Sequence, residues 1–324
     1  MIEGLVSTII PVYNRPAQLQ EAVQSVLVQD YRPIEIVIVD DGSTDDTALA
    51  AAALAHSFPE FIKVVSQANG GPGMARERGR LLARGEFIQY LDSDDVLLPG
   101  KFALQVAALR SDRTCDVAYG ITYLRGADGR LTKRPHKGTG ELVNSMFPKF
   151  LTGRWWETAT PLYRSAVCEL AGPWTDLSLE EDWEYDCRVA SFGGRLVWCP
   201  QAVSEHREHP GTRLSRGQAA DPARLRQRAR AHGLILGHAI KFGMTPAMPE
   251  MQHFARALFL LSRQCGAAGL AEDSSRLFAA ARQASGGRRA RGLDFRVYRL
   301  AASLLGWTSV GKLSSWMDGA RGGR

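Results

Sequence analysis

The first 125 residues alternate between short apolar runs and segments in which apolar residues recur every three or four positions. Residues 5–12 are apolar at nearly every position, as expected for a strand buried on both faces. In the segment that follows, Leu19, Ala22, Val23 and Val26 have helical spacing. Further elements are predicted in the order strand at 34–40, helix at about 44–55, strand at 61–65, helix at about 74–84 and strand at 87–91. This alternation is typical of βαβ units in a mainly parallel sheet.

The pattern changes beyond residue 115. The elements expected there are, in order, a hairpin with a glycine turn at 115–135, a helix at 140–151, a strand at 159–164 and a helix at 180–193. From about Arg213 onward the pattern is helical and rich in arginine, with no strand-like run. We therefore expect an α/β domain at 1–212 and a basic helical region at 213–324.

Composition places the chain among globular proteins. Its 324 residues, 45% hydrophobic and 23% charged, can bury one large core or one core plus a smaller appendage. The five cysteines are odd in number and never spaced as CxxC, which indicates buried thiols and not a disulfide framework or a zinc knuckle. The N-terminus lacks a basic leader, and no apolar run approaches the ~18 residues that span a bilayer. These features predict a cytoplasmic protein.

The net charge of +6 is unevenly distributed. Residues 1–210 contain 21 Lys/Arg and 28 Asp/Glu, whereas residues 211–324 contain 19 and 6. A basic region of this kind favours contact with an anionic surface, but it can equally be a solvated helical extension. Within it, residues 295–317 mix apolar and basic positions as in a helix lying at a membrane interface. Peripheral association with the inner face of the membrane, acceptor binding and homo-oligomerisation all remain open as its role.

Polar residues follow three predicted strands, where ligands bind in parallel sheets. After the second strand, Asp40 and Asp41 precede a Gly-Ser turn. Asp41 could accept a hydrogen bond from the N–H of a pyrimidine base. Alternatively, Ser43 and Asp46 form a capping box that only starts a helix. The residues leave both readings open.

The segment Asp92-Ser93-Asp94-Asp95 follows the fourth strand of the alternating series. Three carboxylates within four residues repel one another unless a cation lies among them. Oxygen ligands suit Mg²⁺ or Mn²⁺, which would stabilise charge on a diphosphate leaving group. The alternative is an acidic cap before the next helix. We favour the metal site.

A third acidic group, Glu180-Glu181-Asp182, opens a predicted amphipathic helix. Acids are favoured in a first helical turn by the helix dipole. A carboxylate here could also take the proton of an attacking hydroxyl. Spacing alone does not choose among the three acids.

Six segments together resemble a known family. They are IIPVYNR, VDDGSTDDT, NGGPGMARERG, GEFIQYLDSDD, GPWTDLSLEEDWEYDCRVASFG and REHPGTRLS. In order and approximate spacing they resemble glycosyltransferase family 2 over about residues 4–215. The resemblance implies an α/β fold of the GT-A type: a Rossmann-like, mainly parallel sheet flanked by helices, here with a C-terminal helical extension. It also implies inverting transfer of one sugar from a UDP- or GDP-sugar to an acceptor hydroxyl, with Mn²⁺ or Mg²⁺.

The resemblance assigns roles to individual residues. Those implied to bind the donor nucleotide are Pro11, Tyr13, Asp41, Arg76, Asp92 and Ser93. Asp92 and Asp94 resemble the two ends of the family's DxD metal motif, and Asp182 matches its catalytic base. Arg207 and His209 match an R-x-H pattern that can face the diphosphate or the metal, so His209 is a further metal candidate.

Two departures from the family pattern matter. Glu77 stands where the family often has Asn. The Q-x-x-R-W motif of processive members is missing, which argues for addition of one sugar per encounter.

Two other functions compete with that of a glycosyltransferase for the same residues. A nucleotidyltransferase acting on sugar phosphates would usually carry a glycine-rich basic loop after the first strand, where this chain has PVYNR. A catalytically inactive sugar-nucleotide-binding protein would not need the acidic motifs intact.

The expected acceptor is a glycan or lipid-linked sugar of surface polysaccharide or glycoconjugate synthesis, and no nucleic acid is expected. Trp155, Trp156 and Trp174 could stack on acceptor sugars.

Overall fold

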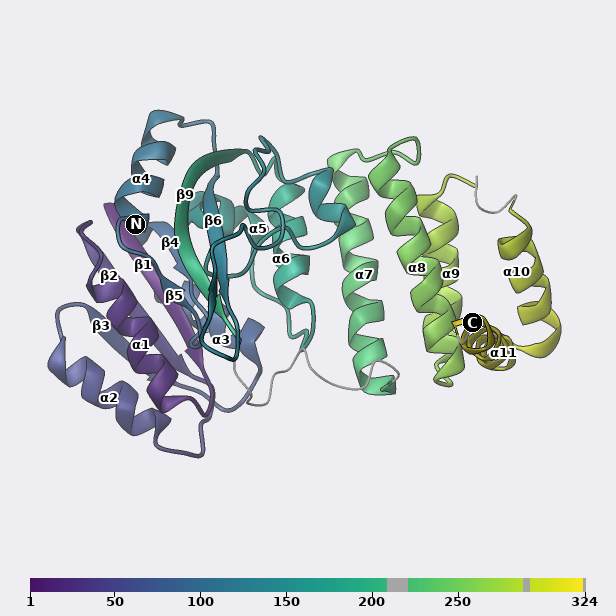
Figure 1. Cartoon of the computed structure of the whole chain (residues 1–324), viewed down its shortest axis with the longest axis horizontal. Coiled ribbons are helices and arrows are strands. Elements are labelled where there is room, and N and C mark those ends of the chain that lie inside the picture. The colour runs from purple at the N-terminus through teal and green to yellow at the C-terminus, as the bar shows by residue number, and fades with distance from the viewer. Residues whose placement is uncertain (209–220, 288–291, 323–324) are drawn as a thin grey trace. The chain divides into compact units, whose positions relative to one another are not determined.

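The computed structural model describes residues 1–208, 221–287 and 292–322. Its contacts divide the chain into two compact units, one of residues 1–146 with 154–211 and one of residues 147–153 with 212–324. Residues 147–153 therefore belong with the helical unit, although they lie far from it in sequence. The first unit carries the sheet, and the second consists of helices in its described residues (Figure 1).

The first unit is built on one nine-stranded sheet, in the spatial order β3-β2-β1-β4-β8-β6-β9-β5, with β7 paired to β6. Its strands are β1 (Ile2–Val12), β2 (Ile34–Asp40), β3 (Ile62–Ser66), β4 (Gly85–Tyr90), β5 (Val96–Leu97), β6 (Val117–Arg125), β7 (Leu131–Thr132), β8 (Leu162–Arg164) and β9 (Leu196–Arg207). β3, β2, β1 and β4 pair in parallel. The predicted mainly parallel core is thus confirmed. Beyond β4 the sheet is mixed, since β8 and β5 pair antiparallel to their neighbours whereas β6 and β9 pair in parallel.

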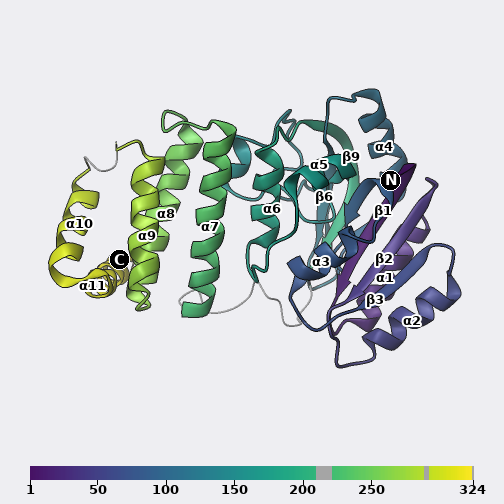
Figure 2. The ribbon, with the colours of Figure 1, turned by 180° about the vertical axis from the view of Figure 1, so that it is seen from behind.

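Helices cover both faces of this sheet (Figure 2). They are α1 (Pro16–Leu27), α2 (Thr47–Ser57), α3 (Pro72–Arg80), α4 (Lys101–Ser111), α5 (Ser165–Ala171) and α6 (Glu181–Ala190). Ile36 and Ile38 of β2 pack in one cluster with residues of α1, α2 and α4, whereas Val37 and Val39 pack against Ala75 of α3. Because alternate residues of a strand point to opposite faces, a strand covered on both sides is apolar throughout.

The structure corrects three local predictions. Residues 140–151 are not a helix: only η1 (Lys149–Thr152) is helical, because Ser145 pairs as an isolated bridge with Arg195. β9 was missed, since Pro200 interrupts its apolar pattern. The capping box is also wrong, because α2 starts at Thr47 and the Ser43 hydroxyl accepts a hydrogen bond from the Asn14 amide instead.

The second unit contains five helices in its described residues, besides η1. They are α7 (Pro222–Phe242), α8 (Pro249–Ala267), α9 (Ala271–Ala284), α10 (Leu293–Leu305) and α11 (Trp307–Gly322). The segment 295–317, expected as one helix, is divided at Gly306, whose φ of 82° ends α10. Across the described parts of both units, no helix is both long enough and apolar enough to cross a membrane. All five cysteines are buried and none forms a disulfide.

Candidate active site

Three loops meet at the carboxyl edge of the parallel strands. The Asp41 amide donates to the carbonyl of Val12, and the Leu91 amide to that of Ile9, so the loops after β1, β2 and β4 leave the sheet side by side. An ion pair between Arg15 and Asp94 joins the first of these loops to the third. The edge predicted from the polar strand ends is therefore a single surface.

Asp41 is buried, and its carboxylate is bound to the chain itself. Its oxygens accept hydrogen bonds from the Gln67 side-chain amide at 2.8 Å, the Gly70 amide at 2.9 Å and the Gly71 amide at 2.8 Å. Gly42 follows with a φ of 76°, and a β-carbon there would come within 2.9 Å of the Asn69 amide. Asp41 therefore holds the loop at 67–71 that precedes α3.

The other residues predicted to contact the nucleotide differ in exposure. Pro11 is buried within β1, and Ser93 is buried in the loop after β4. Tyr13 is 45% exposed beside the loop after β2. Tyr13 is thus available to a ligand at the sheet edge, whereas the side chains of Pro11 and Ser93 are buried.

Arg76 connects two of the acidic motifs. From α3, its buried guanidinium donates to Asp92 at 2.6 Å and to Glu181 at 2.9 Å, and it lies 4.8 Å above the ring of Trp174. Burial opposes ionisation of Asp92, but the charge of Arg76 and its hydrogen bond outweigh burial and lower the pKa of Asp92. Arg76 therefore brings the loop after β4 against the first turn of α6.

The acids of the Asp92–Asp95 loop face different partners. Asp92 pairs with Arg76 and Asp94 with Arg15. Asp95 is buried, and its carboxylate accepts from the Arg207 amide at 3.0 Å and contacts the His206 ring at 3.0 Å. Burial raises the pKa of Asp95 to about 6, although His206 opposes the shift.

Arginine and histidine partners therefore offset the repulsion among these acids, so repulsion alone does not require a cation. The metal site stays a prediction. Among the described residues, no group of three or more His, Cys, Asp or Glu side chains is arranged to hold a metal. Asp92 and Asp94 are the predicted metal ligands that lie at the sheet edge. The third predicted ligand, His209, lies outside the described residues.

Two acids in the first turn of α6, Glu181 and Asp182, differ in burial and pairing. The Glu181 side chain is 9% exposed and is paired with Arg76. Burial and the adjacent charge of Asp182 raise the pKa of Glu181, although Arg76 opposes both. The Asp182 side chain is 25% exposed, and its carboxylate accepts from Arg154 at 2.5 Å and from the Trp183 amide at 2.7 Å. Asp182 thus combines access to solvent with a fixed orientation.

Arg154 is a residue of this site that the sequence did not single out. Its guanidinium is 11% exposed and donates to Asp182, to Thr158 at 3.1 Å and to Asp186 at 3.2 Å. Asp186 is itself buried and also accepts from Trp156 at 3.0 Å and Tyr163 at 2.6 Å. The available signal was an arginine directly before two tryptophans in RWWETAT, since arginine among apolar residues usually has carboxylate partners.

Two of the three tryptophans proposed to stack on acceptor sugars are core residues. Trp156 is fully buried beside Tyr119, with ring centroids 5.4 Å apart. Trp174 is buried between Arg76 and Tyr185, whose ring is stacked on it at 4.0 Å. Trp155 is half-buried against Gly138, where a side chain would collide with its ring.

A charged network continues behind these motifs. The ring of His206, next to Asp95, is stacked on His136 at 5.8 Å, and His136 contacts Glu157 at 3.0 Å. Burial disfavours the Glu157 carboxylate, but the hydrogen bond from His136 and the charge of Lys137 outweigh it and lower the pKa of Glu157. The predicted diphosphate contact Arg207 instead pairs through its guanidinium with Glu21 of α1.

Comparison with known families decides the identity of this arrangement. Residues 7–166 match the family model described as glycosyl transferase family 2. The chain contains a glycosyltransferase family 2 domain over this range. The matched range contains the three loops at the sheet edge, and the acids of α6 lie C-terminal to it, after α5.

Relatives of this family 2 chain are similar over part of their length. An uncharacterized glycosyltransferase of Nostoc sp. is 32% identical over 210 residues, which are 63% of this chain and 65% of the relative. The uncharacterized glycosyltransferase YibD of Escherichia coli is 35% identical over 107 residues, 33% of this chain and 31% of the relative. The chain thus spans less than two thirds of the length of these relatives.

Solved structures show that the family 2 chain has the GT-A fold. TarS residues 1–349 of S. aureus in complex with UDP-GlcNAc has a TM-score of 0.60 and 20% identity, covering 88% of this chain and 91% of that one. The mannosyltransferase PcManGT of Pyrobaculum calidifontis, in complex with GDP-Man and Mn²⁺, has a TM-score of 0.54 and 20% identity, covering 95% and 86%. At these identities the likeness concerns the fold.

Proposed function

We propose that this family 2 member is an inverting, metal-dependent glycosyltransferase that moves one sugar from a nucleotide sugar to an acceptor hydroxyl. The observation that carries the proposal is the bridge from Asp92 through Arg76 to Glu181. It sets the loop after β4, which suits a donor diphosphate, beside the carboxylate of Asp182 on α6. The proposed site of the leaving diphosphate and the proposed base, Asp182, thus lie at one sheet edge.

The donor is a UDP- or GDP-sugar. The S. aureus relative is described with UDP-GlcNAc and the Pyrobaculum relative with GDP-Man, which supports a nucleoside diphosphate in this site. Exposed Tyr13 contacts the base or ribose, and Asp41 acts by holding the loop at 67–71 beside it. Arg76, being paired with two carboxylates, orients the Asp92 loop toward the phosphates.

Asp92 and Asp94 fit a divalent cation that arrives with the donor. They lie two positions apart in one loop, and a nucleotide diphosphate would supply the oxygen ligands that two carboxylates lack. When bound there, Mn²⁺ or Mg²⁺ would stabilise negative charge on the departing diphosphate.

The chemical step is a single displacement. Asp182 accepts the proton of the acceptor hydroxyl as its oxygen attacks the anomeric carbon, and the bond from that carbon to the diphosphate oxygen breaks. One displacement inverts the configuration at the anomeric carbon. Arg154 is a positioning residue, since it directs the Asp182 carboxylate and is itself held by buried Asp186.

The two parts of the chain have separate roles in this proposal. Residues 1–212 are the catalytic domain, and residues 213–324 serve the acceptor, a membrane surface or assembly. The acceptor is a glycan or lipid-linked sugar used in surface polysaccharide or glycoconjugate synthesis.

Donor hydrolysis tests the proposal. The full chain is incubated with UDP-GlcNAc or GDP-mannose, with Mn²⁺ or with excess chelator, and released nucleoside diphosphate is measured beside thermal stability. We expect one donor to raise the melting temperature and to be hydrolysed slowly in a metal-dependent way. Binding without hydrolysis by wild type would favour the inactive binding protein. Pyrophosphate release from a nucleoside triphosphate and a sugar phosphate would favour a nucleotidyltransferase.

A further inference from the structure

Helix α10 is attached to the second unit by one narrow face. Phe295, Tyr298 and Ala302 are buried, at positions that follow one another at helical spacing. The centroid of the Phe295 ring lies 4.3 Å from that of the Phe259 ring and 4.6 Å from that of the Phe278 ring. These contacts, between α10 and the helices α8 and α9, hold α10 in place without using its other faces.

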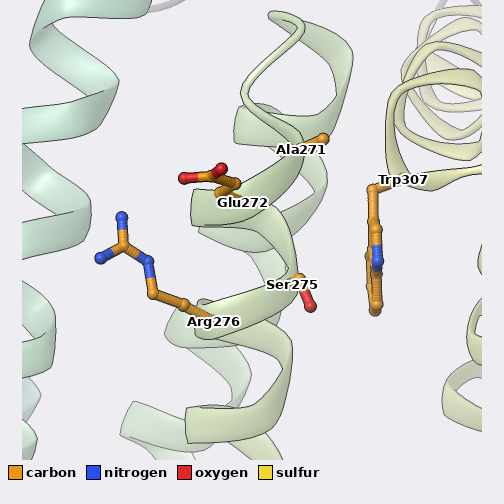
Figure 3. A pocket seen from close by; sticks show the side chains of 5 residues that line it. All are labelled: Ala271, Glu272, Ser275, Arg276 and Trp307. Carbon is orange, nitrogen blue, oxygen red and sulfur yellow. The ribbon is translucent and has the colours of Figure 1, made fainter.

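Trp307, which begins α11, belongs to the same aromatic cluster. Its ring lies 5.3 Å from Phe278 and 6.2 Å from Tyr298. A hollow of about 460 Å³ separates it from α9, but Glu272 and Arg276 point away from the ring, as Figure 3 shows. Of the labelled polar side chains, only Ser275 lies on the side of α9 that faces the ring. The hollow therefore offers one hydroxyl and no charged group to a sugar, and the ring contacts assign Trp307 to the aromatic cluster.

The opposite face of α10 is an exposed apolar row. Its four members are 60% to 81% exposed: Leu293, Val297, Leu300 and Leu304. At 100° per residue they fall within an arc of about 60°, on the side of the helix opposite the buried residues. Four large aliphatic side chains in one row exceed the scattered exposure that is normal on a surface.

The surroundings of this row are basic. Arg296 and Arg299 are exposed on one flank of α10. Within residues 292–312 the basic residues are Arg296, Arg299 and Lys312, and the one acid is Asp294. A second copy packed on the row would bring these like charges together with one acid per chain to offset them. An anionic lipid surface accepts both the apolar row and the arginines.

We propose that α10 is a membrane-interface helix that binds anionic lipid bilayers. Its 13 residues form a rod of about 20 Å, which lies in the plane of the headgroups with the leucine row toward the acyl chains. Arg296 and Arg299 contact lipid phosphates at the level of the headgroups. The aromatic cluster keeps the row facing outward, so the surface is formed before any lipid is met.

Vesicle co-sedimentation of the full chain tests this surface, and it needs no sugar donor. Vesicles of phosphatidylcholine alone are compared with vesicles of phosphatidylcholine and phosphatidylglycerol in equal parts. We expect binding to the anionic vesicles that weakens with salt, and little binding to the neutral ones. The variant Leu300→Ser/Leu304→Ser should reduce affinity at least tenfold, because two exposed leucines no longer enter the bilayer. Arg296→Gln and Arg299→Gln should each reduce it about fivefold.

Matched controls come from the first unit. Leu170 is 61% exposed on α5, and the Arg130 side chain is 90% exposed in a turn, so Leu170→Ser and Arg130→Gln should leave vesicle binding unchanged. Equal loss in the controls, or vesicle binding by the leucine variant equal to wild type, overturns the proposal. Light scattering on the same proteins is the second readout. A dimer that the leucine variant converts to a monomer, with no lipid binding by wild type, would assign the row to a second copy instead.

Discussion

Replacement of Arg154 by methionine should destabilise the first unit. The long methionine side chain keeps part of the packing of the arginine stem but removes its charge. Asp186, which is 1% exposed, then retains hydrogen bonds from Trp156 and Tyr163 but loses its cation. Breaking a buried pair by removing one partner costs roughly 3–5 kcal/mol. Since two donors remain, we expect about 3 kcal/mol, and a melting temperature lower by roughly 6–12 °C.

The loss of stability caused by Arg154→Met should be greater at neutral pH than at acidic pH. Burial already raises the pKa of Asp186, although Arg154 and Tyr163 oppose the shift, and loss of Arg154 raises it further. A carboxyl with a raised folded-state pKa binds its proton more readily in the folded than in the unfolded chain. Stability therefore falls as pH rises from the unfolded-state pKa of this carboxyl to its folded-state pKa. The difference between variant and wild type should be largest near neutral pH and shrink as pH is lowered toward the ordinary aspartate value of ~4.

Denaturant unfolding followed by circular dichroism at several pH values measures both effects. Arg130→Met is the matched control, because that arginine is exposed and its ion pair with Asp128 should contribute less than about 1 kcal/mol. Arg154→Met/Asp186→Asn should recover part of the stability, since no buried charge is left unpaired. An unfolding free energy equal to wild type, or a deficit that grows as pH falls, would refute the reasoning.

Three further predictions concern the active site. Asp182→Asn should keep donor affinity while kcat falls by about 10² or more; near-normal turnover would remove Asp182 as the base. Asp94→Ala should abolish the Mn²⁺-dependent part of nucleotide binding in calorimetric titrations, and full wild-type activity in excess chelator would contradict a metal-dependent step. Gly42→Ala should cost about 1–3 kcal/mol and weaken nucleotide binding, because its φ is 76° and the loop held by Asp41 must move. Gly129→Ala has a similar φ but meets no neighbour, so it should affect stability alone.

The sequence by itself determined the parallel core and the order of its motifs. Residues 5–12 and 34–40 are apolar throughout because each strand is covered on both faces, a signal contained in the strand itself. The polar loops after these strands had to meet at one edge, since parallel strands end on the same side. The locations of Asp41, Asp92 and Asp94 at this edge could be predicted from the sequence for that reason.

Tertiary structure alone decided the partners of these residues. The acids at 92–95 read as a group that needs a cation, but Arg15, Arg76 and His206 approach them from positions 16 to 111 residues away. Arg154 and Asp186 face each other across 32 residues, and β9 pairs beside β6 despite Pro200. Such contacts depend on how helices and strands pack and leave no periodic trace in the chain. The apolar row of α10 was visible in sequence, yet only the buried aromatic face opposite it decided that the row points outward.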